Sequence, residues 1–144
     1  MQTQAHESRD KAGPAADLRV AHAMTNAWTD RPIRRLEDLP EATIRLMNDY
    51  GVAASGMTGG RHDWRIPGMV ANAWATHGRC VFNTREFARR YGSTRRTVNK
   101  AIKRLVAAGA IRHIGRTADK RPILVPVLEV GAMWRAGYER RANG

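Results

Sequence analysis

Residues 84–127 have the sequence TREFARRYGSTRRTVNKAIKRLVAAGAIRHIGRTADKRPILVPV, and this stretch decides the fold of the chain. Its apolar residues first recur at steps of three and four, which is the spacing of helices, and then alternate, which is the spacing of strands. Glycines stand where the period changes. The stretch therefore predicts two helices followed by a β-hairpin.

The first of these helices is expected to be about two turns long. Asn83 is placed to cap its free amides and Glu86 to close a capping box. The residues expected to point inward are Phe87, Ala88 and Tyr91. Gly92 follows them, and its access to positive φ permits the tight turn that leads into the next helix.

The second helix is expected to begin at Thr94 and to end near Gly109, which is suited to a C-terminal cap. Its expected buried stripe is Val98, Ala101, Ile102, Leu105 and Val106. Its outward face is then Arg95, Arg96, Asn99, Lys100, Lys103 and Arg104. Exposed helices usually mix acids with bases, yet no acid lies between Glu86 and Asp119. Such a face suits the DNA major groove, where arginine pairs with guanine and asparagine with adenine.

The hairpin is expected to begin with alternating residues at 111–115, to turn over the polar residues 116–121, and to continue from Ile123. Pro122 and Pro126 favour a short edge ribbon over a central strand. A basic ribbon directly after a reading helix has the pattern of a wing, which can lie along phosphates or enter the minor groove.

The positive charge of the chain is concentrated in this region. The chain has 25 Lys and Arg against 13 Asp and Glu, a net charge of +12, and residues 79–121 hold 13 of the bases and two of the acids, or +11. Cations docked on duplex DNA release condensed counterions, so phosphate is the expected partner. The alternative is a solvated basic surface that only keeps the protein soluble.

Residues 84–127 resemble the reader module of GntR-type bacterial winged helix-turn-helix proteins. The resemblance rests on Phe87-Ala88 with Tyr91-Gly92, on residues 94–98, on Ala101-Ile102 with Leu105, and on Gly109 with Ile111. It implies base contacts for Thr94, Arg95, Arg96 and Asn99, and backbone contacts for residues 116–121. GntR-type regulators carry a large effector domain after the reader, whereas residues 128–144 follow here. We therefore expect regulation by occupancy, autoregulation or a protein partner, and not by a small molecule.

Two sets of DNA-contacting residues follow. The expected base-reading residues are Thr94, Arg95, Arg96, Asn99 and Lys100. The expected phosphate and wing residues are Thr84, Arg85, Arg89, Lys103, Arg116, Lys120 and Arg121.

The chain is expected to be mainly α with a small β-hairpin, an α+β winged helix-turn-helix with extra terminal helices. Its expected parts are a disordered tail (1–16), a helical extension with a glycine-rich linker (17–62), the DNA-binding domain (63–128) and a C-terminal helix (129–144). In the extension, one helix starts at Asp17, and a second is capped by Asp38 and stops at Gly51. In the domain, a helix from Pro67 or Gly68 buries Met69, Val70, Ala73, Trp74 and His77, and a short strand follows at Val81-Phe82.

The C-terminal helix carries an apolar stripe, Val130, Met133, Trp134 and Tyr138. It either folds back on its own domain or forms a dimer seam with the amino-terminal helices. We expect a homodimer, because two small readers can engage half-sites about 34 Å apart. The terminal helices are also candidates for binding a partner protein.

Other chemistry receives little support from the sequence. His77 and Cys80 form one close pair of metal-ligand types, whereas zinc requires three or four ligands, so we expect no metal, no cofactor and no enzyme. The four tryptophans lie outside the basic segment, which favours core or interface packing over stacking on single-stranded DNA or RNA. With one cysteine and no apolar run of signal or membrane length, we expect a cytoplasmic protein that does not contact a membrane.

The sequence thus predicts a sequence-specific regulator of transcription, a repressor, that binds double-stranded DNA and is of bacterial or mobile-element origin. The alternative is a plasmid or phage replication or partition adaptor that marks a DNA site and recruits proteins. A module that docks only onto protein or an RNA-protein complex is a third reading.

Overall fold

The structure, a computed structural model, describes residues 35–143. Its elements in this range are the 3₁₀ turns η1 (Leu36–Asp38) and η2 (Asp63–Arg65), the helices α3 (Glu41–Ser55), α4 (Ile66–His77), α5 (Thr84–Arg90), α6 (Arg95–Ala107) and α7 (Glu129–Asn143), and the strands β1 (Cys80–Val81), β2 (Ile111–Arg116) and β3 (Pro122–Pro126). The expected α+β class, mainly helical, is confirmed. The expected tail (1–16) and the helix starting at Asp17 lie outside the described residues.

The three strands form one antiparallel sheet in the order β1-β3-β2. β3 is therefore central, and the prediction of an edge ribbon is wrong. β1 pairs with β3 only at Ile123 and Leu124, so Pro122 and Pro126 stand at the ends of the strand, where a missing amide leaves the internal ladder intact. The register shifts between His113 and Gly115, which bends the outer strand β2.

Two predicted helix caps in the basic segment are confirmed, but the predicted capping box is not formed, because the Glu86 carboxylate pairs with Arg89. The side-chain oxygen of Asn83 accepts a 3.0 Å hydrogen bond from the amide of Glu86 at the start of α5. The hydroxyl of Thr94 accepts a 3.1 Å bond from the amide of Thr97 at the start of α6. Gly92 and Gly109 have φ of +61° and +83° at the two turns, a conformation that glycine adopts without strain.

Helix α3 differs from its prediction at both ends. Pro40, without a side-chain hydrogen bond, occupies the N-cap position expected for Asp38, and the helix continues past Gly51 to Ser55. Tyr50 and Ala54 lie one turn apart on its buried face. Their burial outweighs the cost of about 1 kcal/mol that a glycine adds to a helix interior.

Helix α4 buries a different stripe from the one expected. Val70 and Trp74 are fully buried, as predicted, but Met69 and His77 are exposed and Ala71 is buried instead. The helix also begins earlier, at Ile66, with Pro67 in its first turn, where the missing amide has no partner to lose.

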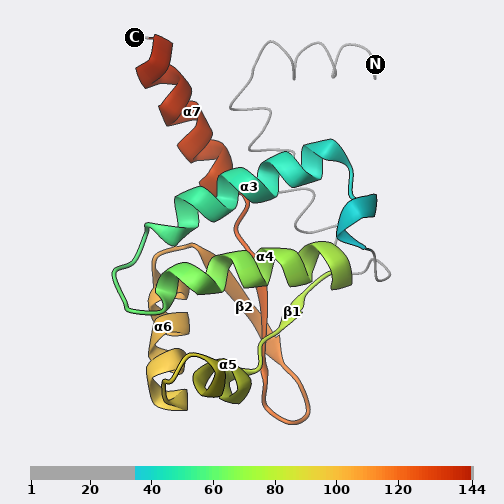
Figure 1. The fold of residues 1–144 in the computed structure, drawn as a ribbon, viewed down its shortest axis with the longest axis vertical. Coiled ribbons are helices and arrows are strands. Elements are labelled where there is room, and N and C mark those ends of the chain that lie inside the picture. The colour runs from blue at the N-terminus through green and yellow to red at the C-terminus, as the bar shows by residue number, and fades with distance from the viewer. Residues whose placement is uncertain (1–34, 144) are drawn as a thin grey trace.

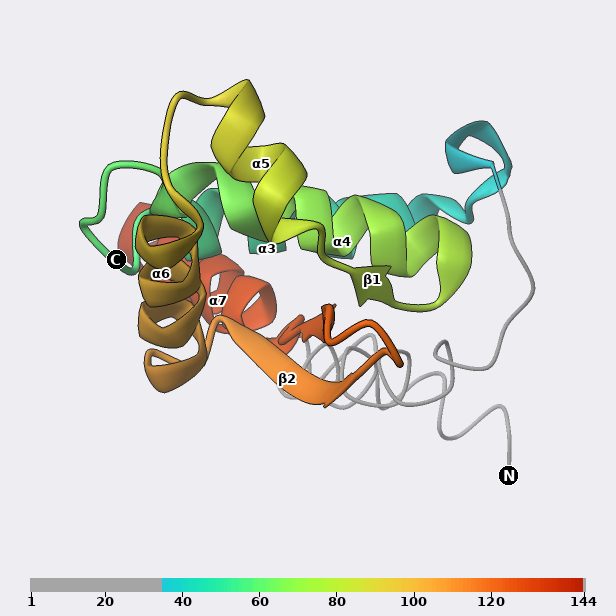
Figure 2. The same ribbon diagram turned by 90° about the horizontal axis from the view of Figure 1, so that it is seen from below.

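One hydrophobic core joins nearly all of these elements. It includes Leu46 and Tyr50 of α3, Trp74 of α4, Leu105 of α6 and Leu124 of β3. In Figure 1, α3 and α4 lie across the middle of the molecule, and α5, α6 and the β2–β3 loop lie at the opposite end from the carboxyl end of α7. Figure 2 shows β2 starting near the carboxyl end of α6 and running away from it.

Candidate nucleic-acid interface

The outward face of α6 gathers four of the five expected base-reading residues. Val98 and Leu105 on the inner face are fully buried, so the helix can present only its polar side outward. A shallow surface depression is lined by Arg95, Arg96, Asn99, Lys100 and Lys103, and all five are exposed. Among the described residues, no carboxylate lines this depression, so every charged group that lines it is positive.

Thr94, the fifth expected base-reading residue, is exposed, but its side chain caps the amino end of α6. Its hydroxyl accepts from the amide of Thr97 and donates a 3.0 Å hydrogen bond to the Thr97 hydroxyl. The structure therefore places Thr94 as the cap that orients the first turn of α6.

Arg104 does not belong to the outward set, which corrects the sequence-based assignment. Its guanidinium turns to the fully buried carboxylate of Asp63 in η2, with Nε to Oδ2 and Nη2 to Oδ1 both 2.9 Å. Hydrogen bonding to Arg104 holds the pKa of Asp63 below its ordinary value, although burial opposes this. The pair fastens α6 to the segment before α4.

The β2–β3 turn is ordered by its own hydrogen bonds. The amide of Thr117 donates to the carbonyl of Arg121 and the amide of Lys120 donates to the carbonyl of Thr117, both at 2.9 Å. The guanidinium of Arg116 donates to the carbonyl of Lys120 at 3.1 Å, and Lys120 has a positive φ of 68°. The turn thus holds Arg116, Lys120 and Arg121 exposed at one tip.

Two of the expected phosphate-binding residues have acidic partners. Arg89 lies 2.6 Å from Glu86 and Arg121 lies 3.0 Å from Asp119. Both pairs are exposed, and exposed ion pairs contribute only about 0 to 1 kcal/mol. Phosphate can therefore replace these carboxylates at little cost. Of the remaining expected contacts on α5, Arg85 is exposed and Thr84 is half-buried.

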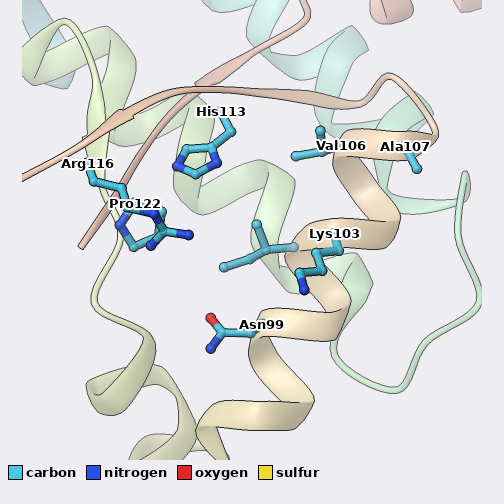
Figure 3. Close-up of a pocket in the computed structure, with 8 residues that line it drawn as sticks. Asn99, Lys103, Val106, Ala107, His113, Arg116 and Pro122 are labelled. Atoms are coloured by element: carbon cyan, nitrogen blue, oxygen red, sulfur yellow. The ribbon is translucent and has the colours of Figure 1, made fainter. Parts of the chain in front are cut away.

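A groove of about 370 Å³ separates α6 from the hairpin (Figure 3). Asn99, Lys103, His113 and Arg116 stand around it, and its surface is mainly apolar. The sequence-based assignment missed His113, which is exposed here although Ile111, two residues earlier, is buried. Val106 was expected in the core, but it is 36 % exposed and lines the groove. Alternation along β2 places His113 on the same face as Ile111, so the sequence pattern gave no signal for its position at the groove.

The aromatic residues divide between core and surface. Trp74 is fully buried, which confirms core packing for this residue. Trp64 is 54 % exposed, and the guanidinium of Arg65 lies between it and Tyr91, 4.2 and 4.3 Å from the two ring centroids. On α7, Trp134 stacks on Tyr138 with centroids 5.6 Å apart.

Cys80 is a buried core residue, as expected, and burial raises the pKa of its thiol to about 12. Across residues 35–143, no three His, Cys, Asp or Glu side chains are grouped closely enough to hold a metal ion. Within the same range, no helix has both the length and the apolar character needed to cross a bilayer.

Comparison of the chain with protein-family models, with curated proteins and with solved structures found no match.

Proposed function

We propose that this chain is a winged helix-turn-helix protein that binds double-stranded DNA and acts as a sequence-specific transcriptional regulator, a repressor, of bacterial or mobile-element origin. The chain order α4-β1-α5-α6-β2-β3 supports this reading. So does the sheet order β1-β3-β2, which leaves β2 outermost and adjacent to the carboxyl end of α6. In this proposal α6 is the reading helix and the β2–β3 hairpin is the wing.

The observation that carries the proposal is the acid-free outward face of α6. Its five exposed residues include two arginines and one asparagine, which are the side chains that make paired hydrogen bonds to guanine and adenine edges. The capped amino end of the helix carries the two arginines, and the amino-terminal residues of a recognition helix are those that meet base edges.

The phosphate contacts are assigned to Lys103, farther along this face, and to residues that flank the face. The flanking residues are Thr84, Arg85 and Arg89 on α5, and Arg116, Lys120 and Arg121 at the hairpin tip. Contacts at these positions would fix the register of the protein on DNA without selecting a sequence.

Selection of bound fragments from a random duplex pool, followed by fluorescence anisotropy at several salt concentrations, tests the proposal. We expect an enriched motif and an affinity that falls steeply with salt, by a slope of about 0.9 per phosphate contact. An isotherm that does not respond to duplex DNA at low ionic strength would show that the proposal is wrong. It would favour a module that docks onto protein or an RNA-protein complex.

A replication or partition adaptor is the second candidate, and the exposed part of α7 could serve it or the repressor. Met133 is 62 % and Tyr138 48 % exposed, although both are large apolar side chains. An adaptor would use this surface for a partner protein, whereas a homodimeric repressor would use it for a second copy. A single palindromic motif with a dimer in sedimentation supports the repressor, and an array of direct repeats supports the adaptor.

A further inference from the structure

The groove between α6 and the hairpin has a feature that DNA binding does not require. Its polar and basic lining residues are Asn99, Lys103, His113 and Arg116, but most of its surface is apolar. The apolar lining residues are Ile102, Val106 and Ala107 of α6 and Pro122 of β3. Phosphates need only the polar and basic residues, since they bind through charge and hydrogen bonds.

The combination of apolar and basic lining residues specifies the chemistry of a ligand. An apolar surface favours a ring system, and the cations Lys103 and Arg116, one on each side of the groove, favour a negative group on that ring. The volume, about 370 Å³, lies at the lower end of the range typical of small-molecule sites. Within the described part of the chain, the groove lining has no aspartate or glutamate that would repel an anion.

We propose that this groove binds a small aromatic carboxylate, and that the bound carboxylate excludes DNA from the hairpin side of α6. The ring packs against Val106 and Pro122, and the carboxylate accepts hydrogen bonds from Arg116 and Lys103. Binding would place one negative charge against two cations assigned to phosphate and so offset half of their positive charge. The exclusion of DNA rests on the proposed DNA-binding function, whereas the binding of the carboxylate does not. The site lies on the reading surface itself, so no separate effector domain is needed for the chain to respond to a small molecule.

The test uses the full, ¹⁵N-labelled chain, with 2-naphthoate as the probe and the uncharged 2-naphthamide as its matched analogue. We expect saturable shifts of the amide signals of Asn99, Lys103 and His113, with a Kd of about 0.1 to 1 mM, as for other ligands of this size. The amide should bind at least about tenfold more weakly, because it lacks the charge that Lys103 and Arg116 recognise. Equal binding of the two probes, or no saturation by naphthoate, would overturn the proposal.

Two variants locate the site. Val106→Glu places a carboxylate in the groove and should weaken naphthoate binding at least about tenfold. Ile114→Glu is the matched control, because Ile114 lies on β2, is 48 % exposed and does not line the groove. Circular dichroism checks that both variants fold. Arg116→Gln should bring the affinities for naphthoate and naphthamide closer together while preserving the fold. Similar losses in Val106→Glu and Ile114→Glu would show that the probe binds elsewhere.

The second half of the proposal is tested with the wild-type protein and its selected duplex. Naphthoate should raise the apparent Kd for DNA about tenfold at a concentration ten times its own Kd, and sodium chloride at equal ionic strength should not. If naphthoate and DNA bind together, the exclusion is wrong while the site remains. A chain that binds naphthoate but no DNA would refute the proposed function and leave the site standing.

Discussion

The phenolic hydroxyl of Tyr50 donates a 2.6 Å hydrogen bond to the backbone carbonyl of Ala110, 60 residues away. Tyr50 lies in α3, and Ala110 lies in the turn that connects α6 to β2. Both residues are fully buried. Helix α3 therefore holds in place the junction of the proposed reading helix and the proposed wing. It is also part of the same hydrophobic core as α4, α6 and β3.

The substitution Tyr50→Phe measures this link. It removes one buried hydrogen bond, and the Ala110 carbonyl keeps a partner because the amide of Val127 donates to it at 3.1 Å. We expect a loss of about 1 kcal/mol in the free energy of unfolding, as for a typical single hydrogen bond. Urea unfolding provides the measurement. Tyr138→Phe, at an exposed position, should change stability by less than about 0.5 kcal/mol.

Cys80 makes the free energy of unfolding depend on pH in the alkaline range. Burial raises the pKa of its thiol from 9.0 to about 12. Because the folded pKa is the higher one, the stabilisation is complete below pH 9 and is lost as pH rises from 9 toward 12. Unfolding free energies at pH 8 and pH 11 should differ by roughly 1 to 3 kcal/mol more in the wild type than in Cys80→Ala. Parallel pH profiles for the two proteins would contradict this assignment.

At Gly131, α7 packs closely against the backbone of α3. A Cβ atom at this position would lie 2.4 Å from the amide nitrogen and 2.7 Å from the Cα of Tyr50. Gly131→Ala must push the helices apart, and we expect it to cost about 1 to 3 kcal/mol in thermal or urea unfolding. Gly137→Ala is the matched control on the same helix, where the nearest atoms are arginine side-chain nitrogens at 3.4 Å or more. It should stabilise the helix by about 0.5 to 1 kcal/mol.

The sequence predicted the parts of the fold that depend on neighbouring residues. The caps at Asn83 and Thr94 and the glycine turn at position 92 require only residues within one helical turn, and all are confirmed. The exposed face of α6 follows from its apolar period in the same way. Arg104 shows the limit, because its partner Asp63 lies 41 residues away and no local pattern indicates the pairing.

The central position of β3 and the exposure of Val106 at the groove also depend on tertiary contacts that a local sequence pattern does not indicate. Pro122 and Pro126 indicated an edge strand. The strand is central because it also pairs with the two-residue β1, and this pairing is a tertiary contact between separate parts of the chain that no local pattern indicates. Val106 fits the helical period of the core, yet it is exposed where the packing of α6 against the sheet ends, beside β2. Periodicity predicts which residues share a face and not how far a neighbouring element covers that face.

The Asp63–Arg104 pair predicts a stability defect when the arginine is removed. Arg104→Met leaves a buried carboxylate without its cation and should lower the free energy of unfolding by roughly 2 to 3 kcal/mol. This loss is smaller than for a fully buried pair, because Arg104 is partly exposed. The lowered pKa of Asp63 gives stabilisation that is present above its ordinary value of 3.8 and is lost as pH falls below it. In Arg104→Met that loss at acidic pH should shrink. Lys103→Met, at the adjacent exposed position, is the control, and an equal defect in it would contradict the role of the pair.

Arg96 and Lys120 separate the two kinds of DNA contact. Arg96→Ala on the outward face of α6 should cost about 1 to 3 kcal/mol on the selected duplex and relax specificity at one base position. Lys120→Ala at the hairpin tip should weaken binding to selected and random duplexes alike and lower the salt slope by about one. Anisotropy titrations of both variants on both duplexes, at three or more salt concentrations, provide the measurement. Neither side chain is buried or paired with an acid in the described structure, so both variants should unfold like the wild type. If the two losses were the same on both duplexes, α6 and the hairpin would make the same kind of contact, and α6 would not be the reading helix.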